Sequence, residues 1–170
     1  DARGRLWVIE SLSYPDWSQA KGPGKDRVVI LEDRDGDGRS DSRRVFLDNG
    51  RNLSGIALGF GGVWLCSAPE LIFIPDRDGD DKPDSPPEVV LDGWSLEAKH
   101  NMVNGLGWGP DGWLYGCQGY ATRSSVGSPS DGGRILRRGD PFPDDLKPKN
   151  PQFLDGGVWR YHPTKDRFEV

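Results

Sequence analysis

The stretch Asp33-Arg-Asp35-Gly-Asp37-Gly38-Arg-Ser-Asp41 recurs 43 residues later as Asp76-Arg-Asp78-Gly-Asp80-Asp81-Lys-Pro-Asp84. Each copy lies between two short apolar runs, which are 28–31 and 45–47 for the first and 71–74 and 89–91 for the second. An acidic turn between two β-type runs is typical of a hairpin, and its repetition at a fixed period indicates a repeat architecture.

Other elements come into register when the two acidic stretches are aligned. Three copies of one strand opening appear at Gly4–Ile9, Gly62–Cys66 and Gly112–Cys117. The repeating unit therefore has four strands, which predicts an all-β fold: a partial β-propeller of about three four-stranded antiparallel blades. The blade units are approximately 1–50, which lacks its inner strand, 53–93, and 104–170, which carries an insertion at 118–156.

The repeat also predicts individual strands. They are 55–60, 63–67, 70–75 and 88–92 in the second unit, and 105–109, 113–118, 157–162 and 167–170 in the third. The insertion is rich in Gly, Pro and Ser and is expected to be irregular. A flat antiparallel sandwich is the alternative fold, but it does not readily explain the recurrence of a whole four-strand unit. Since propellers close with four to eight blades, three units are expected to be a piece of a larger ring.

Composition and charge argue against nucleic-acid binding and against a membrane-spanning segment. The chain has 170 residues, Gly 24, Pro 14, Trp 7 and a net charge of −5, with no basic stripe for nucleic acid and no run long enough to span a membrane. No signal peptide is visible, and a chain that starts on Asp1 is expected to be a mature piece or a fragment.

Cys66 and Cys117 occupy equivalent positions in neighbouring blades and are expected to remain unbridged, because packed sheets lie about 10 Å apart. Neither begins a Cys-x-x-Cys-His motif, so no haem is expected in this chain.

The acidic loops are candidate calcium sites, because alternating carboxylates wrap a hard cation around a glycine turn. The first is expected to bind through the side chains of Asp33, Asp35, Asp37 and Asp41 and the backbone carbonyl of Arg39. The second has Asp81 where glycine is expected and should bind more weakly, through Asp76, Asp78, Asp80 and Asp84. The alternative for both is a solvated acidic turn.

His100 is the candidate catalytic residue. Up-and-down strands place both acidic loops at one end of the blades and the long loops at the other, where functional sites gather. His100 lies at that second end, just before an inner strand, and an imidazole there can act as a general base with Asn101 and Asn104 as partners. A structural role in the loop is the alternative. His162, in a turn at the opposite end, is expected to be a surface residue.

The chain resembles a known family. His100 followed by Trp108-Gly-Pro-Asp-Gly-Trp-Leu-Tyr115 is similar to the signature of glucose/sorbosone dehydrogenases, which are six-bladed propellers that use pyrroloquinoline quinone. Longer stretches, such as Gly4-Arg-Leu-Trp-Val-Ile-Glu10, Leu91-Asp-Gly-Trp94 and Gly157-Val-Trp-Arg-Tyr-His-Pro163, resemble the "membrane-bound dehydrogenase" propellers of planctomycetes.

The resemblance implies a quinone-dependent dehydrogenase that oxidises a sugar or an alcohol, with His100 as the base that removes the hydroxyl proton. It also implies a periplasmic or exported protein and a cytochrome c-type electron-acceptor domain outside this chain. Further cofactor contacts are proposed from their place at the same end of the blades: Arg51, Asn52, Lys99, Asn104 and Arg123. The alternative function is a non-catalytic, calcium-stabilised propeller that binds glycans or partner proteins.

Overall fold

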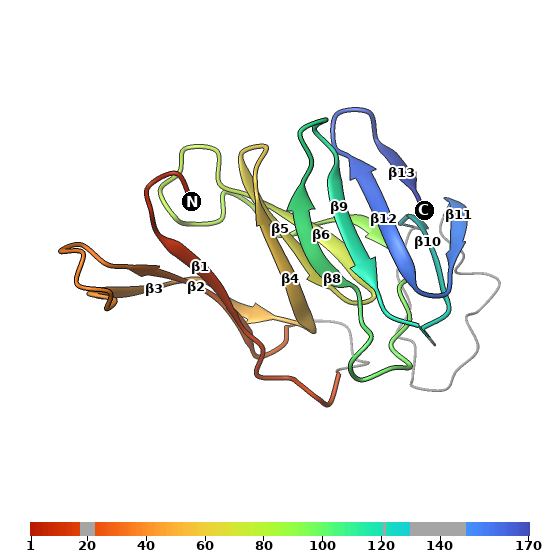
Figure 1. Cartoon of the computed structure of the whole chain (residues 1–170), viewed down its shortest axis with the longest axis horizontal. Coiled ribbons are helices and arrows are strands. Elements are labelled where there is room, and N and C mark those ends of the chain that lie inside the picture. The colour runs from red at the N-terminus through yellow and green to blue at the C-terminus, as the bar shows by residue number, and fades with distance from the viewer. Residues whose placement is uncertain (18–22, 121, 130–148) are drawn as a thin grey trace.

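The computed structural model describes residues 1–17, 23–120, 122–129 and 149–170, and the regular elements in these ranges are all β-strands (Figure 1). They form three antiparallel sheets. The first sheet has the order β1 (Leu6–Glu10), β2 (Asp26–Glu32) and β3 (Ser42–Gly50). The third has the order β13 (Arg167–Glu169), β12 (Gly157–His162), β9 (Leu114–Gln118) and β8 (Asn104–Trp108).

The second sheet lies between the other two and has six strands. Its order is β11 (Lys149–Leu154), β10 (Ser124–Ser128), β7 (Glu88–Asp92), β6 (Glu70–Pro75), β5 (Gly62–Ser67) and β4 (Leu53–Leu58). β4 packs beside both β1 and β8, so neighbouring sheets meet along this strand.

Two hydrophobic clusters join the sheets, one on each face of the second sheet. Val63 and Leu65 of β5 pack with Val28 and Ile30 of the first sheet. Trp64, the residue between them, points the other way into a cluster with residues of the third sheet, including Leu114, Trp159 and Tyr161. Successive side chains of a strand point to opposite faces, so a strand buried on both faces has a continuous apolar run, as β5 and β6 do.

The loops sort to two ends of the sheets (Figure 1). The β4–β5, β8–β9 and β12–β13 turns lie along one edge together with the acidic loop between β6 and β7. The connections from β3 to β4 and from β7 to β8 lie at the opposite edge, beside the segment that follows β1. This is the arrangement that up-and-down strands predict.

The predicted strands of the second and third units agree with the structure to within two residues, but the prediction for the insertion was wrong. Residues 124–128 and 149–154, expected to be irregular, form a hairpin whose β10 pairs with β7 at Gly127 and Asp92. Because backbone groups make this pairing, the segment needs no apolar alternation to become a strand. Residues 121 and 130–148 of the insertion lie outside the described residues.

Two further expectations concern single residues. Cys66 is buried, Cys117 is half-buried, and both thiols are free, as predicted. His162 was expected at the surface, and this was wrong: its side chain is buried against the edge of Trp113, with ring centroids 5.1 Å apart. An aromatic ring in the facing β8–β9 turn covers the imidazole, a contact between turns that local sequence does not show.

Candidate functional site

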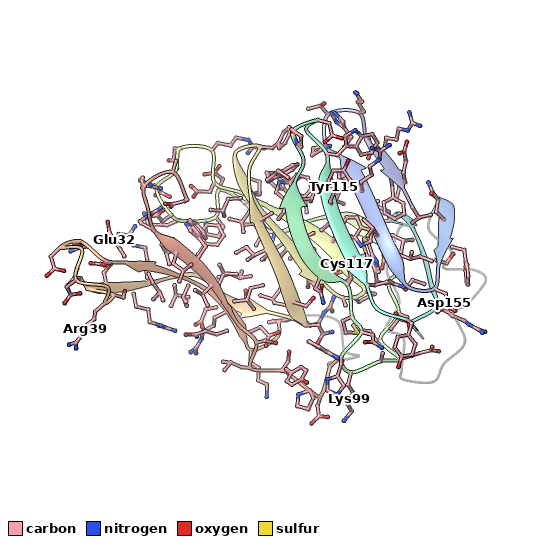
Figure 2. The ribbon with its side chains drawn as sticks, in the orientation of Figure 1. Glu32, Arg39, Lys99, Tyr115, Cys117 and Asp155 are labelled. Atoms are coloured by element: carbon pink, nitrogen blue, oxygen red, sulfur yellow. The ribbon has the colours of Figure 1, made fainter. Side chains whose placement is uncertain are left out.

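A pocket of about 450 Å³ opens where β1 ends and where β4 and β8 begin. It is formed by three segments that are distant in sequence: the chain after β1, the start of β4 and the connection that leads into β8. Its lining residues are Ile9, Ser11, Tyr14, Trp17, Leu53, Ser54, Lys99, His100, Met102 and Asn104. Lys99 marks this end of the molecule in Figure 2, on the side opposite the strand turns.

A fully buried carboxylate holds the segment after β1 in place. Asp26, at the start of β2, accepts hydrogen bonds from the backbone N–H and the hydroxyl of Ser13, both at 2.7 Å. It also accepts the backbone N–H of Leu53 at 2.9 Å, which ties the start of β4 to the same group. Buried carboxylates require such donors, and here they fix Tyr14, the next residue, at the pocket wall.

The segment that carries His100 is fixed on both sides of that residue. The indole N–H of Trp17 donates to the carbonyl of Lys99 at 2.9 Å, and the backbone N–H of Gly119 donates to the carbonyl of Asn101 at 3.1 Å. Met102 is buried at 2% exposure and anchors the segment in the core. The backbone around His100 is therefore held by contacts with two other loops.

The ring of His100 has a partner that the sequence did not indicate. Its Nδ1 lies 2.6 Å from the hydroxyl of Tyr14, and the two ring centroids are 5.7 Å apart. The expected partners are engaged elsewhere: Asn101 donates to the carbonyl of Tyr120, and Asn104 accepts a hydrogen bond from the thiol of Cys117 at 3.2 Å. Tyr14 therefore orients the imidazole.

The residues proposed as cofactor contacts divide into two groups. Lys99 and Asn104 line the pocket with His100, and the Lys99 ammonium lies 3.4 Å from Asp16. The other three lie outside this pocket. Arg51 pairs with Glu70 at 2.9 Å beside a different cavity. Asn52 is fully buried and donates to the carbonyl of Ala68, and the exposed Arg123 lies 3.5 Å from Asp155.

The two acidic loops are closed by the same backbone hydrogen bond. In the first, Asp41 accepts the backbone N–H of Arg34 at 2.6 Å, and in the second Asp84 accepts that of Arg77 at 2.8 Å. In the first loop, one carboxylate oxygen from each of Asp33, Asp35 and Asp37 lies within 4.8 Å of the other two. The same is true of Asp76, Asp78 and Asp80 in the second loop. Three of the four predicted aspartates of each loop are thus brought together, while Asp41 and Asp84 are described only as acceptors of backbone N–H groups. The carbonyl of Arg39 belongs to the first loop and remains a predicted ligand. Glu32 and Arg39 mark that loop at one edge of Figure 2.

The first residues of the two loops differ in environment. Asp33 is exposed and accepts the backbone N–H groups of Gly38 and Gly36, which lower the pKa of its carboxyl. Asp76 is half-buried, and its Oδ1 has no hydrogen-bond partner among the described residues. Burial, followed by the nearby charges of Asp80, Asp81 and Asp78, raises the pKa of Asp76.

Asp81 occupies the position of Gly38, and like that glycine it has a left-handed backbone, with φ 68° against 84°. Its side chain is buried at 3% exposure and bonds bidentately to Arg5, with both N–O distances 2.7 Å. Arg3 and Arg44 also pair with it. The hydrogen bond from Arg5 is the main reason that the pKa of Asp81 is lowered. Three arginines of the first sheet's chain segment therefore hold the second loop.

Sequence reasoning missed Tyr14 and Trp17 in the pocket and the arginine partners of Asp81. The aromatic pair in Ser13-Tyr-Pro-Asp-Trp17 was the available signal, because it interrupts a loop already placed at the functional end. Nothing local indicated the arginines, since Arg5 and Asp81 are 76 residues apart.

Comparison with protein families gives one match. The family model described as "Domain of unknown function (DUF7133)" matches residues 1–159. A search of curated proteins found no match. In the part of the chain that the structure describes, no helix has the length and apolar character needed to cross a membrane.

Proposed function

Since the chain belongs to the DUF7133 family, a domain of unknown function, we propose its activity from its own residues. In this proposal the chain is part of a β-propeller dehydrogenase that uses a quinone to oxidise a sugar or an alcohol. The three sheets are blades of that propeller, and His100 is the general base. The observation that carries it is the pocket that joins His100, Lys99 and Asn104 where the inner strands begin. Its volume is within the range of small-molecule and cofactor sites.

The pocket suits a flat anionic cofactor in part. Its volume of about 450 Å³ accommodates pyrroloquinoline quinone, two aromatic side chains line it, and the Lys99 ammonium can pair with a carboxylate of that cofactor. Arg51 and Arg123 lie outside this pocket, so Lys99 is the residue we assign to hold the quinone. When bound, the quinone would accept the hydride that leaves the hydroxyl-bearing carbon of the substrate.

The protein's own part in this reaction is the proton transfer. His100 would take the proton of the substrate hydroxyl while the carbon–oxygen bond becomes a carbonyl, and imidazole suits this role near neutral pH. Asn104 would offer its amide to an oxygen of the substrate at the same wall of the pocket.

Calcium is proposed for the acidic loops in a stabilising role. Three carboxylate oxygens that converge without a cation repel one another, and a hard cation relieves that repulsion. Neither loop lies at the pocket: the loop between β6 and β7 is at the edge of the strand turns, and the loop between β2 and β3 extends at the far left of Figure 1. This favours a structural contribution of calcium over a catalytic one.

The activity is tested with the full-length protein supplied with pyrroloquinoline quinone and calcium. We expect it to reduce an artificial electron acceptor with at least one member of a panel of aldoses and alcohols. His100→Ala should lower that turnover by about a hundredfold or more, because the general base is lost, while circular dichroism and calcium binding stay unchanged.

Two outcomes contradict the dehydrogenase. One is the absence of turnover with every substrate, which would favour the alternative function, a non-catalytic propeller that binds glycans or partner proteins. The other is unchanged turnover in a folded His100→Ala variant, which leaves His100 a structural residue.

A further inference from the structure

The hydrogen bond between Tyr14 and His100 joins two loops that are 86 residues apart in the chain. It is short, at 2.6 Å, and both partners belong to segments that other bonds already fix. Tyr14 also contacts Trp17 in an edge-on arrangement, with ring centroids 5.8 Å apart. The position of its hydroxyl is therefore set by the aromatic packing and by the Ser13–Asp26 anchor.

The direction of this bond decides what His100 can do. If Nδ1–H donates to the tyrosine oxygen, Nε2 has a free lone pair and can accept a proton. If the tyrosine hydroxyl donates to Nδ1, Nε2 carries the ring proton and is only a donor. Tyr14 is 50% exposed, so its own hydroxyl proton can bond to water, and accepting from Nδ1–H costs it no partner.

We propose that Tyr14 is a positioning residue for His100: its oxygen accepts Nδ1–H and leaves Nε2 as the nitrogen that takes a proton from a bound hydroxyl. This inference rests on the proposed function, because it assigns how the same base is prepared. When Nε2 gains the proton, the ring becomes a cation, and its bond from Nδ1–H to Tyr14 becomes charge-assisted and stronger. The hydroxyl oxygen of the ligand keeps the electron pair that it shared with that proton.

The decisive variant is Tyr14→Phe, because it deletes the hydroxyl and keeps the ring that packs against Trp17. Tyr120→Phe is the matched control, since Tyr120 is 78% exposed and its side chain makes no hydrogen bond with another described residue. Both are made in the full-length protein, and circular dichroism establishes that each is folded.

The first measurement is the tautomer of His100 by nitrogen-15 nuclear magnetic resonance, with His100→Ala used to assign its signals. We expect the Nδ1–H form in the unmodified protein and in Tyr120→Phe, and a shift towards the Nε2–H form in Tyr14→Phe, because free imidazole side chains favour that form. The Nε2–H form in the unmodified protein, or an unchanged tautomer in Tyr14→Phe, overturns the inference.

The second measurement is turnover with the best substrate of the panel. Tyr14→Phe should lower kcat by about 10- to 100-fold with little change in KM, since the lost bond matters most when the ring is charged. Equal kcat in Tyr14→Phe and Tyr120→Phe overturns the positioning role. If no substrate is turned over, the proposed function fails, and the tautomer measurement still decides whether Tyr14 sets the ring.

Discussion

The loops 33–41 and 76–84 share the backbone N–H bond to the last aspartate and the left-handed sixth residue, yet they differ in what surrounds that sixth residue. In the first loop it is Gly38, and no atom lies within 4 Å of where a side chain would begin. In the second it is Asp81, which is buried among Arg3, Arg5 and Arg44. One loop extends into solvent, and the other joins the second sheet to the chain segments of the first.

The difference shows how one repeat can serve two purposes. A glycine at a left-handed position has no steric cost, whereas an aspartate there costs conformational energy that neighbouring contacts must offset. The bidentate bond to Arg5 is a contact of the required strength, because charge-assisted bonds to carboxylates are the strong ones. We infer that protein cations hold the second loop, whereas among the described residues the first is held by hydrogen bonds within the hairpin itself.

The largest effect is expected from Asp81→Asn. This change keeps the shape and the tolerance for a left-handed backbone but leaves the buried Arg5 facing a neutral amide, with Asp1 as its remaining ionised partner. Breaking a buried ion pair from one side costs about 3 kcal/mol or more of unfolding free energy. Urea denaturation of the protein with a calcium chelator present measures it.

The matched control is Asp35→Asn in the first loop, where the side chain is exposed and no arginine pairs with it among the described residues. We expect no measurable loss of unfolding free energy. Equal effects of the two substitutions would show that the arginines add nothing to the second loop.

A smaller effect is expected from acid. The folded-state pKa of Asp81 is lowered, so its contribution is present above the unfolded value of about 3.9 and is lost as pH falls through the folded pKa. The folded-state pKa of Asp76 is raised by burial, so its ionised form costs stability above that pKa. Asp76→Asn should therefore stabilise the chelated protein at neutral pH, while Asp81→Asn destabilises it.

The Asp76→Asn difference should vanish below about pH 4, where that carboxyl is neutral in both the folded and the unfolded parent protein. The Asp81→Asn difference should begin to shrink only below about pH 4 and should go on shrinking as pH falls through the lowered folded pKa of Asp81. Melting temperatures of the parent and the two variants between pH 7 and pH 3 provide the measurement. A stability difference for Asp81→Asn that stays constant over this range would mean that its charge is not what the arginines recognise.

The sequence predicted the strands well because the repeat and the continuous apolar runs of β5 and β6 are local signals. The prediction placed β4 two residues too far along the chain. Phe60 cannot belong to the strand because it takes a left-handed φ of 56°, which a bulky residue rarely adopts. Pairing of β10 with β7 was missed because backbone groups form it from a stretch that reads Ser-Ser-Val-Gly-Ser.

The candidate site was predicted only in part for a related reason. His100, Lys99 and Asn104 lie within five residues of one another and were placed at the correct end by counting strands. Tyr14 reaches His100 from another repeat, and such contacts depend on how the sheets pack. Asp81 was interpreted only as a departure from the calcium-loop pattern. Its arginine partners lie far away in the sequence, within the first ten residues and at Arg44, so no local signal indicated them.

The smallest effect concerns calcium affinity. The Lys82 ammonium lies 2.8 Å from Oδ2 of Asp80, a residue of the second candidate cation cluster, and it lowers the pKa of that carboxyl. Arg39, at the equivalent position of the first loop, donates only its backbone N–H to Asp37 among the described residues. Lys82→Ala should therefore raise the calcium affinity of the second loop by about two- to fivefold, the range expected for an exposed ion pair, while Arg39→Ala leaves the first loop unchanged. Calorimetric titration separates the sites if Asp35→Lys is used as a background, because a cation then replaces one carboxylate of the first loop. Equal changes in the two loops would mean that the net charge of the protein, and not the Lys82–Asp80 contact, controls calcium affinity. The absence of calcium heat in the parent protein would mean that neither loop is a calcium site.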